Sequence, residues 1–198
     1  MFRLKYKSGF SFVDFIIGFL VLGFASTIAL NVVANYQKET KNNVITSQTI
    51  KEYAYNTLWD GEFQKLNQAT NMILVSNSNT LENLCSGNLQ NKCMMEQYFK
   101  VLSAMNSCPD NVKGRCWHND GEWFLSNRTP STENIDLASG LILNNGVFVL
   151  FNNVDTSCTN RICGQIYVDV NGFNKPNRIG NDIFKINILK NSIVKENM

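Results

Sequence analysis

The sequence predicts an α+β protein in which a long N-terminal membrane-spanning helix packs on a small antiparallel sheet of about four strands. Two observations carry this prediction. A long apolar run followed by a helical pattern occupies the first part of the chain, and strand patterns separated by turn signals occupy the last part. Helix first and antiparallel sheet afterwards is an α+β order, with the helix packed on one face of the sheet.

Residues 10–30 are predicted to form a helix that crosses a membrane. They contain a single charge, and as a helix they would span about 30 Å, the thickness of the hydrocarbon core. Arg3, Lys5 and Lys7 precede the run, which predicts that the N-terminus stays in the cytoplasm. The expected location is therefore a membrane, with a single pass and with the rest of the chain outside the cytoplasm.

The helical pattern is expected to continue over residues 31–75, and residues 76–198 are expected to form a globular head. A partly apolar stripe follows the membrane segment at helical spacing. Trp59, Asp60 and Gly61 then predict an end or a kink, because Asp and Gly favour turns. The expectation is one long helix with a break.

The clearest strand signal is a hairpin in the second half of the chain. The segments GLIL and VFVLF flank an Asn-Asn-Gly turn at 144–146. Two further strands are predicted at 165–170 and 183–189. Earlier in the chain, Met and aromatic residues between Cys93 and Met105 recur at helical spacing, which is more typical of a core helix than of a ligand site.

The composition fits one folded domain and gives no sign of nucleic-acid binding. The chain has 198 residues, of which 44% are hydrophobic, enough for a core. Its formal net charge is +2, from 18 basic and 16 acidic residues, so no general positive field would attract nucleic acid. We therefore expect no specific nucleic acid among the partners.

The cysteines indicate disulfide bonds and an oxidising compartment. Sequence alone leaves their connectivity open, and three local bridges are favoured because short loops close most easily. A metal site is the weaker alternative, since the spacings do not match paired CxxC ligands and the chain has 1 histidine. The close pairs are Cys85 with Cys93, Cys108 with Cys116, and Cys158 with Cys163.

The segment between Cys108 and Asn127, called the tryptophan loop below, is expected to be a small hairpin or stapled loop. An Asn-Asp-Gly turn at 119–121 separates Trp117 from Trp123. The two indoles would form either a sugar-stacking platform or a packed edge of the domain.

His118 also lies in the tryptophan loop, beside Asp120 and Glu122. We expect a surface histidine rather than a catalytic one, because no nucleophile or second basic partner lies near it in the sequence.

The N-terminal sequence resembles the class III leader of type IV pilins and type II secretion pseudopilins. The resemblance rests on Lys-Ser-Gly-Phe at 7–10, followed by Asp14 and a long apolar helix. In that family a prepilin peptidase cuts after the glycine and methylates the new N-terminal residue. This implies that the leader, residues 1–9, is removed after Gly9 and that Phe10 is methylated.

The family's acidic residue at the fifth mature position is matched here by Asp14. The resemblance implies that its carboxylate neutralises the N-terminal amine of a neighbouring subunit during assembly, because either charge alone is costly in hydrocarbon. Two departures are visible. Asp replaces the usual Glu, and Asn31 stands where many major pilins have a helix-kinking proline.

The function implied by this resemblance is structural, not enzymatic. The chain would be a minor pilin or pseudopilin in a type IV pilus or a type II secretion-like filament. Its partners would be other pilin subunits, the prepilin peptidase and the bacterial inner membrane, with the head in the periplasm and then on the pilus or cell surface. The alternative is a membrane-anchored extracytoplasmic binding module that forms no filament. A tethered enzyme ranks last, because no serine motif, metal box or phosphate loop is present in the sequence.

A loop rich in turn residues links the last two predicted strands. Similar loops, of the form DxNGxxxPNxxGxDxF, occur near the C-terminus of many pilin-like proteins. Asp169, Asn171, Asn177 and Asp182 could supply oxygen ligands for calcium, although their spacing differs from that of an EF-hand. The other interpretation is a loop that its own Asx turns and glycines hold in place. Calcium is thus the one cofactor that the sequence raises.

Overall fold

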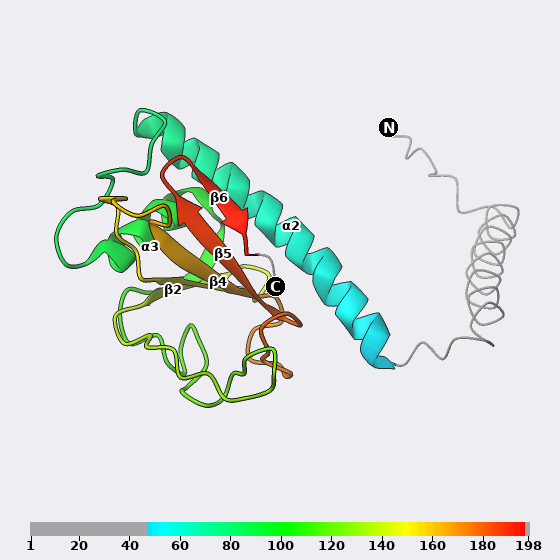
Figure 1. Ribbon diagram of the computed structural model, residues 1–198. Helices are drawn as coiled ribbons and strands as arrows, with labels where there is room; N and C mark the ends of the chain where they lie inside the picture. Colours follow the sequence, from blue (N-terminus) through cyan, green and yellow to red (C-terminus); the bar gives the residue numbers. More distant parts are fainter. Residues whose placement is uncertain (1–46, 197–198) are drawn as a thin grey trace, which may run out of the picture. The chain divides into compact units, whose positions relative to one another are not determined.

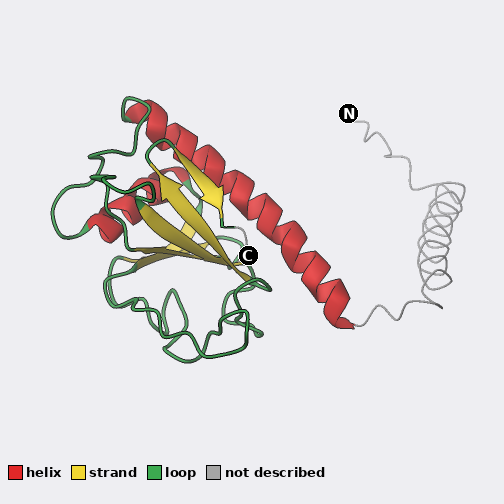
Figure 2. Cartoon of the chain, viewed as in Figure 1, coloured by secondary structure: helices red, strands yellow, loops and turns green. Residues whose placement is uncertain are grey.

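The computed structural model describes residues 47–196, so the leader, the apolar run at 10–30 and Asp14 lie outside the described residues. Within this range the chain forms two helices and one six-stranded sheet (Figure 1, Figure 2). In chain order the elements are α2 (Ser47–Ser76), α3 (Gln90–Val101), β1 (Ala104–Cys108), β2 (Ser139–Leu143), β3 (Phe148–Asn152), β4 (Gly164–Asp169), β5 (Ile183–Leu189) and β6 (Ser192–Lys195).

The sheet is an antiparallel meander whose strands lie side by side in sequence order, from β1 to β6. The expected hairpin is present as β2 and β3, with Leu141 opposite Val149. Gly146 in its turn has φ +84°, a conformation that glycine adopts without steric cost. At one edge, the register between β1 and β2 shifts after Ala104, so β1 carries a bulge or similar irregularity.

Both faces of the sheet are covered. The two helices lie on one face and long loops lie on the other (Figure 2). Alternate residues of β3 therefore enter two separate cores, Val149 and Phe151 with the helices, and Phe148 and Leu150 with the tryptophan loop. Burial on both faces explains why all five residues of β3 are buried.

The C-terminal part of α2 packs on the sheet through an apolar stripe. Leu66 and Ile73 are buried in the helix-side core, and Trp59 stacks on Phe184 of β5 with ring centroids 4.7 Å apart. The break that we expected at 59–61 does not occur, because α2 continues through these residues. Packing of Trp59 on one side of Gly61 and of Leu66 on the other outweighs the low helix propensity of glycine, about 1 kcal/mol.

The second helix, α3, matches the expected Met and aromatic stripe. Met94, Met95 and Tyr98 are buried, and they pack with the sheet. The Tyr98 hydroxyl lies 2.5 Å from Thr70 Oγ1 of α2, so a hydrogen bond joins the two helices inside the core. Burial raises the pKa of Tyr98 above its ordinary value, and the contact with Thr70 lowers it by less.

The predicted fold class was wrong in two respects. The sheet has six strands, not about four, because β1 and β6 were not recognised. In addition, the described residues contain two helices and no membrane-spanning helix packed on the sheet. The two missed strands are partly exposed and contain few apolar residues, so they lack the pattern that identified the central four.

The single-pass inner-membrane location is corrected by the same structure. Across residues 47–196, neither helix is long and apolar enough to cross a membrane. The longer helix, α2, carries charged side chains such as Lys51, Asp60 and Lys65, which are costly in hydrocarbon.

The expected disulfides are confirmed. Each of the six cysteines is bonded to its near neighbour in the sequence, and none of them is free. The bonds are Cys85–Cys93, Cys108–Cys116 and Cys158–Cys163, with sequence separations of 8, 8 and 5. Such bonds form and persist in oxidising environments.

Candidate functional site

The C-terminal loop, residues 170–181, joins β4 to β5 between two buried carboxylates. Asp169 ends β4, and Asp182 immediately precedes β5. Asp169 pairs with Ile183 across the two antiparallel strands, so both carboxylates lie at the same end of the sheet. Their side chains are fully buried and therefore need hydrogen-bond partners.

Asp182 holds the loop through three N–H donors. Its Oδ2 accepts hydrogen bonds from the backbone N–H of Asn177 at 2.8 Å and from Nδ2 of Asn171 at 3.0 Å. Its Oδ1 accepts one from the backbone N–H of Arg178 at 2.7 Å. These bonds satisfy the buried carboxylate and fix the route of the chain around it.

Asp169 forms a buried pair with His118 of the tryptophan loop. His118 Nε2 and Asp169 Oδ2 are 2.7 Å apart, and both side chains are shielded from solvent. The other carboxylate oxygen, Oδ1, accepts the backbone N–H of Asn171 at 3.0 Å. The pair therefore ties the tryptophan loop to the C-terminal loop.

Asn177 fixes the tautomer of His118. Its Nδ2 lies 3.3 Å from His118 Nδ1 and 3.3 Å from the backbone carbonyl oxygen of Glu122. An amide nitrogen only donates, so Nδ1 of the ring is the acceptor. The ring proton is then on Nε2, where it is donated to Asp169 Oδ2.

Burial raises the pKa of Asp169 from its ordinary 3.8 to about 6. The hydrogen bonds from His118 and from the backbone of Asn171 lower this pKa, whereas the negative charge of Asp182 raises it further. Burial is the largest of these effects. The carboxyl thus changes protonation much closer to neutral pH than an exposed aspartate does.

The four residues expected to bind calcium do lie around this one loop. However, the oxygens of Asp169 and Asp182 already accept N–H donors, as described above, and no group of three or more His, Cys, Asp or Glu side chains within residues 47–196 is placed to hold a metal ion. The buried Oδ1 atoms of Asn171, Asn177 and Asn181 have no hydrogen-bond partner. These amide oxygens carry no formal charge, and both carboxylates are already engaged by N–H donors, so the arrangement favours the self-capped loop.

The structure corrects one expectation for the tryptophan loop and decides between two alternatives for its indoles. His118 is buried rather than on the surface, with 1% of its area exposed. Trp117 and Trp123 are fully buried and meet edge to face, with centroids 5.6 Å apart, so they cannot act as a sugar-stacking platform. They fill the second core, between the sheet and the loop.

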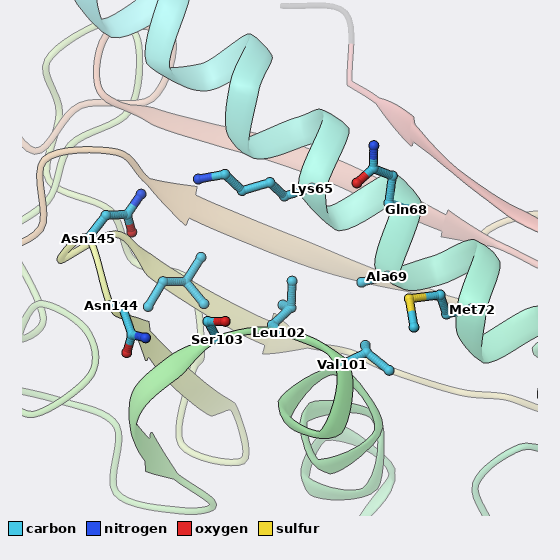
Figure 3. A pocket seen from close by; sticks show the side chains of 10 residues that line it. Lys65, Gln68, Ala69, Met72, Val101, Leu102, Ser103, Asn144 and Asn145 are labelled. Carbon is cyan, nitrogen blue, oxygen red and sulfur yellow. The ribbon is translucent and has the colours of Figure 1, made fainter.

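A hollow of about 390 Å³ lies between α2 and the β2–β3 turn (Figure 3). Its floor is apolar and includes Ala69 and Leu102, while Lys65, Gln68 and Asn145 surround it. The ammonium of Lys65 lies 2.7 Å from Glu62 Oε1, which also accepts a hydrogen bond from Asn145 Nδ2 at 2.8 Å. The charge at this hollow is therefore already paired.

The acidic and amide residues of the C-terminal loop lie together as the sequence predicts, but the sequence does not predict the partner of Asp169. His118 is 51 residues away from it. A histidine beside polar residues at a turn resembles a surface residue, and no local signal indicates that the turn folds over the end of β4. The residues expected to be processed or to act in assembly, Gly9, Phe10 and Asp14, lie outside the described residues.

The fold and this network define an α+β protein with a helix-covered antiparallel meander. Comparisons of the chain with protein-family models, with curated proteins and with solved structures find no significant match.

Proposed function

We propose that this chain is a structural subunit, a minor pilin or pseudopilin, of a type IV pilus or type II secretion-like filament. The observation that carries the proposal is the sequence Lys-Ser-Gly-Phe at 7–10, followed by Asp14. A prepilin peptidase would cleave after Gly9 and leave a methylated Phe10 as the first residue. The chain would then associate with other pilin subunits.

The exposed part of α2 supports this proposal. Ile50 and Tyr53 are 61% and 77% exposed, in contrast to the buried residues later in the same helix. Covering large apolar side chains with a partner lowers the free energy of the assembly by about 25 cal/mol for each Å² removed from water. Neighbouring helices in a filament would provide such a cover.

The carboxylate of Asp14 supplies the pairing chemistry. After cleavage, Phe10 carries a positively charged amine, and a carboxylate four residues later in a neighbouring subunit can neutralise it. Asp is one methylene shorter than the usual Glu, which limits the reach of this contact. A minor subunit tolerates such a limit better than a major one.

The native N-terminus tests the processing step. Mass spectrometry of the protein purified from its own cells should show a chain that begins at N-methylated Phe10. An intact Met1 would contradict the proposal and would favour the alternative, a binding module that forms no filament.

Asp14 tests the assembly step. Asp14→Ala should abolish recovery of the protein in sheared filaments while leaving its cellular amount unchanged. Asp14→Glu is the matched control, because it keeps the charge and restores the family's usual residue, and it should keep filament recovery. Equal recovery of the Ala and Glu variants would count against the pairing.

Calcium binding by the C-terminal loop has its own test. If Asp169, Asn171, Asn177 and Asp182 hold calcium, excess chelator should lower the melting temperature and added calcium should restore it. An unchanged melting temperature would establish that hydrogen bonds alone hold the loop.

A further inference from the structure

We propose that a pocket beside the start of α3 binds a neutral carbohydrate. The pocket has a volume of about 370 Å³. Its walls come from the start of α3 and the segment before it, from the segment before β2, and from the end of β3 with the two residues that follow. Its most conspicuous property is the concentration of side-chain amides. The amide residues are Asn88, Gln90, Asn91, Asn134, Asn152 and Asn153.

The lining contains no ionisable side chain. A charged ligand would enter this pocket without a partner for its charge, which is unfavourable. Side-chain amides both donate and accept hydrogen bonds, and so do the hydroxyl groups of sugars. The chemistry of the pocket therefore matches a neutral ligand that carries several hydroxyl groups.

Asn152 supplies a buried group whose hydrogen-bonding capacity is not fully used. The residue is 2% exposed, and its Nδ2 donates to the carbonyl oxygen of Asn134 at 3.1 Å. No hydrogen bond within residues 47–196 reaches its Oδ1. The bond from Nδ2 to Asn134 fixes the orientation of the amide, and Oδ1 is free to accept a hydrogen bond from a hydroxyl group of a ligand.

Asn91 gives the pocket a fixed wall. Its Oδ1 accepts the backbone N–H of Val154 at 2.8 Å, and its Nδ2 donates to the carbonyl oxygen of Leu137 at 2.8 Å. These bonds join three separate segments of the chain around the pocket. A site that is rigid before binding loses less entropy when a ligand arrives.

The remaining walls suit the apolar C–H face of a sugar ring. Leu137 is 79% exposed and lines the pocket together with Val154. The volume lies near the lower end of the range for small-molecule pockets, about 300–1,000 Å³, so it fits a sugar unit better than an extended chain.

This pocket shares no residue with the leader or with Asp14, so its proposed ligand does not depend on the filament function. The test uses the full chain and four neutral sugars, D-glucose, D-galactose, D-mannose and N-acetyl-D-glucosamine, with D-glucuronate as the charged comparison. Saturation-transfer NMR should detect binding of at least one neutral sugar, with a Kd of about 1 mM or tighter, and weaker binding of D-glucuronate.

Two variants place the binding in this pocket. Asn152→Leu and Asn88→Ala should each weaken binding about tenfold, because each removes a hydrogen-bonding amide. Asn88 is exposed and makes no side-chain hydrogen bond within residues 47–196, so its variant should fold and decides the matter if Asn152→Leu unfolds. Asn191→Ala, in the turn between β5 and β6, is the matched control and should bind as the unchanged protein does.

Three results would overturn the proposal. None of the four sugars gives a signal, D-glucuronate binds as tightly as the best neutral sugar, or Asn88→Ala binds with unchanged affinity.

Discussion

At the scale of single residues, the buried pair of His118 and Asp169 is the most unusual feature of the described chain. Burying a charged carboxylate costs free energy because it loses its hydration. Here one imidazole N–H and one backbone N–H offset that desolvation penalty only in part. The remaining penalty is expressed as the raised pKa of Asp169, about 6. Ionisation of Asp169 should therefore contribute to the pH dependence of stability.

The predicted sign follows from the two states of the protein. The pKa of Asp169 is 3.8 in the unfolded chain and about 6 in the folded one, so between these values the folded state keeps a proton that the unfolded state releases. The contribution of this group to stability is full below pH 3.8 and is lost as the pH rises through about 6, a loss of about 3 kcal/mol.

Urea denaturation between these pH values checks this prediction. The unfolding free energy of the unchanged protein should fall with pH more steeply than that of Asp169→Asn, which cannot ionise at this position. The slope is the readout, because the amide also changes the contact with His118 and so shifts the absolute stability. Parallel curves for the two proteins would contradict the assignment.

Gly172 in the C-terminal loop offers a second test at this scale. It has φ +64°, and a Cβ at this position would lie 2.8 Å from the backbone carbonyl oxygen of Gly146. Gly172→Ala should therefore lower the unfolding free energy by about 3 kcal/mol, from backbone strain and from the clash together. Gly87 is the matched control, because it has φ +78° but open space around it. Gly87→Ala should cost only about 1 kcal/mol, and equal losses would remove the clash from the explanation.

The sequence predicts the position of some of these residues but not all of their contacts. The carboxylates and amides of the C-terminal loop could be assigned to one loop because they are close neighbours in the chain. The contact between His118 and Asp169 could not be predicted, since it depends on how the tryptophan loop folds over the end of β4. Long-range packing of this kind leaves no periodic pattern in either segment.

At the scale of elements, α2 changes its surroundings along its length. Its first turns expose Ile50 and Tyr53, whereas later turns bury Leu66 and Ile73 against the sheet. Figure 1 shows that the first part of the helix extends beyond the strands. The two parts should therefore respond differently to the same substitution.

A pair of leucines tests this difference. Leu66→Ala should lower the unfolding free energy by about 3 kcal/mol, because Leu66 is fully buried and its truncation leaves a cavity. Leu58→Ala should change it by less than about 0.5 kcal/mol, because Leu58 is 47% exposed. Chemical denaturation of both variants gives the two values, and a large loss at Leu58 would show that this part of α2 is covered.

The central strands were predicted well and the outer ones were not. The predicted segments at 165–170 and 183–189 agree with β4 and β5 to within a residue at each end. β4 is buried over most of its length and β5 alternates buried with partly exposed residues, and both patterns are typical of strands. β1 has the sequence AMNSC and β6 the sequence SIVK, so neither shows such a pattern. Their pairing partners, rather than their own residues, make them strands.

At the scale of the whole molecule, the sheet divides the interior into two cores, and disulfides reinforce the segments around them. Cys85–Cys93 closes the connection between α2 and α3 on the helix side, and Cys108–Cys116 closes the tryptophan loop on the other. Short loops closed by a covalent bond have fewer conformations in the unfolded chain.

Removal of one bond should therefore weaken the fold without changing its architecture. The double variant Cys85→Ala, Cys93→Ala should lose about 2.5 kcal/mol of unfolding free energy, as the loop length predicts. Thermal denaturation followed by circular dichroism measures the loss. The unchanged protein in excess dithiothreitol should melt at a lower temperature still, because all three bonds are then open, and a melting temperature unaffected by reduction would contradict the prediction.

The two outer strands also affect how copies of the protein can meet. A flat, regular edge strand invites another strand to extend the sheet, which is a common route to aggregation. Here β1 is irregular next to Ala104, and its Ser107 N–H donates to Asn106 Oδ1 at 2.8 Å instead of remaining open. The opposite edge, β6, is only four residues long and ends at Lys195. Growth of the sheet from copy to copy is therefore disfavoured at both edges, and helix faces and loops remain for ordered association.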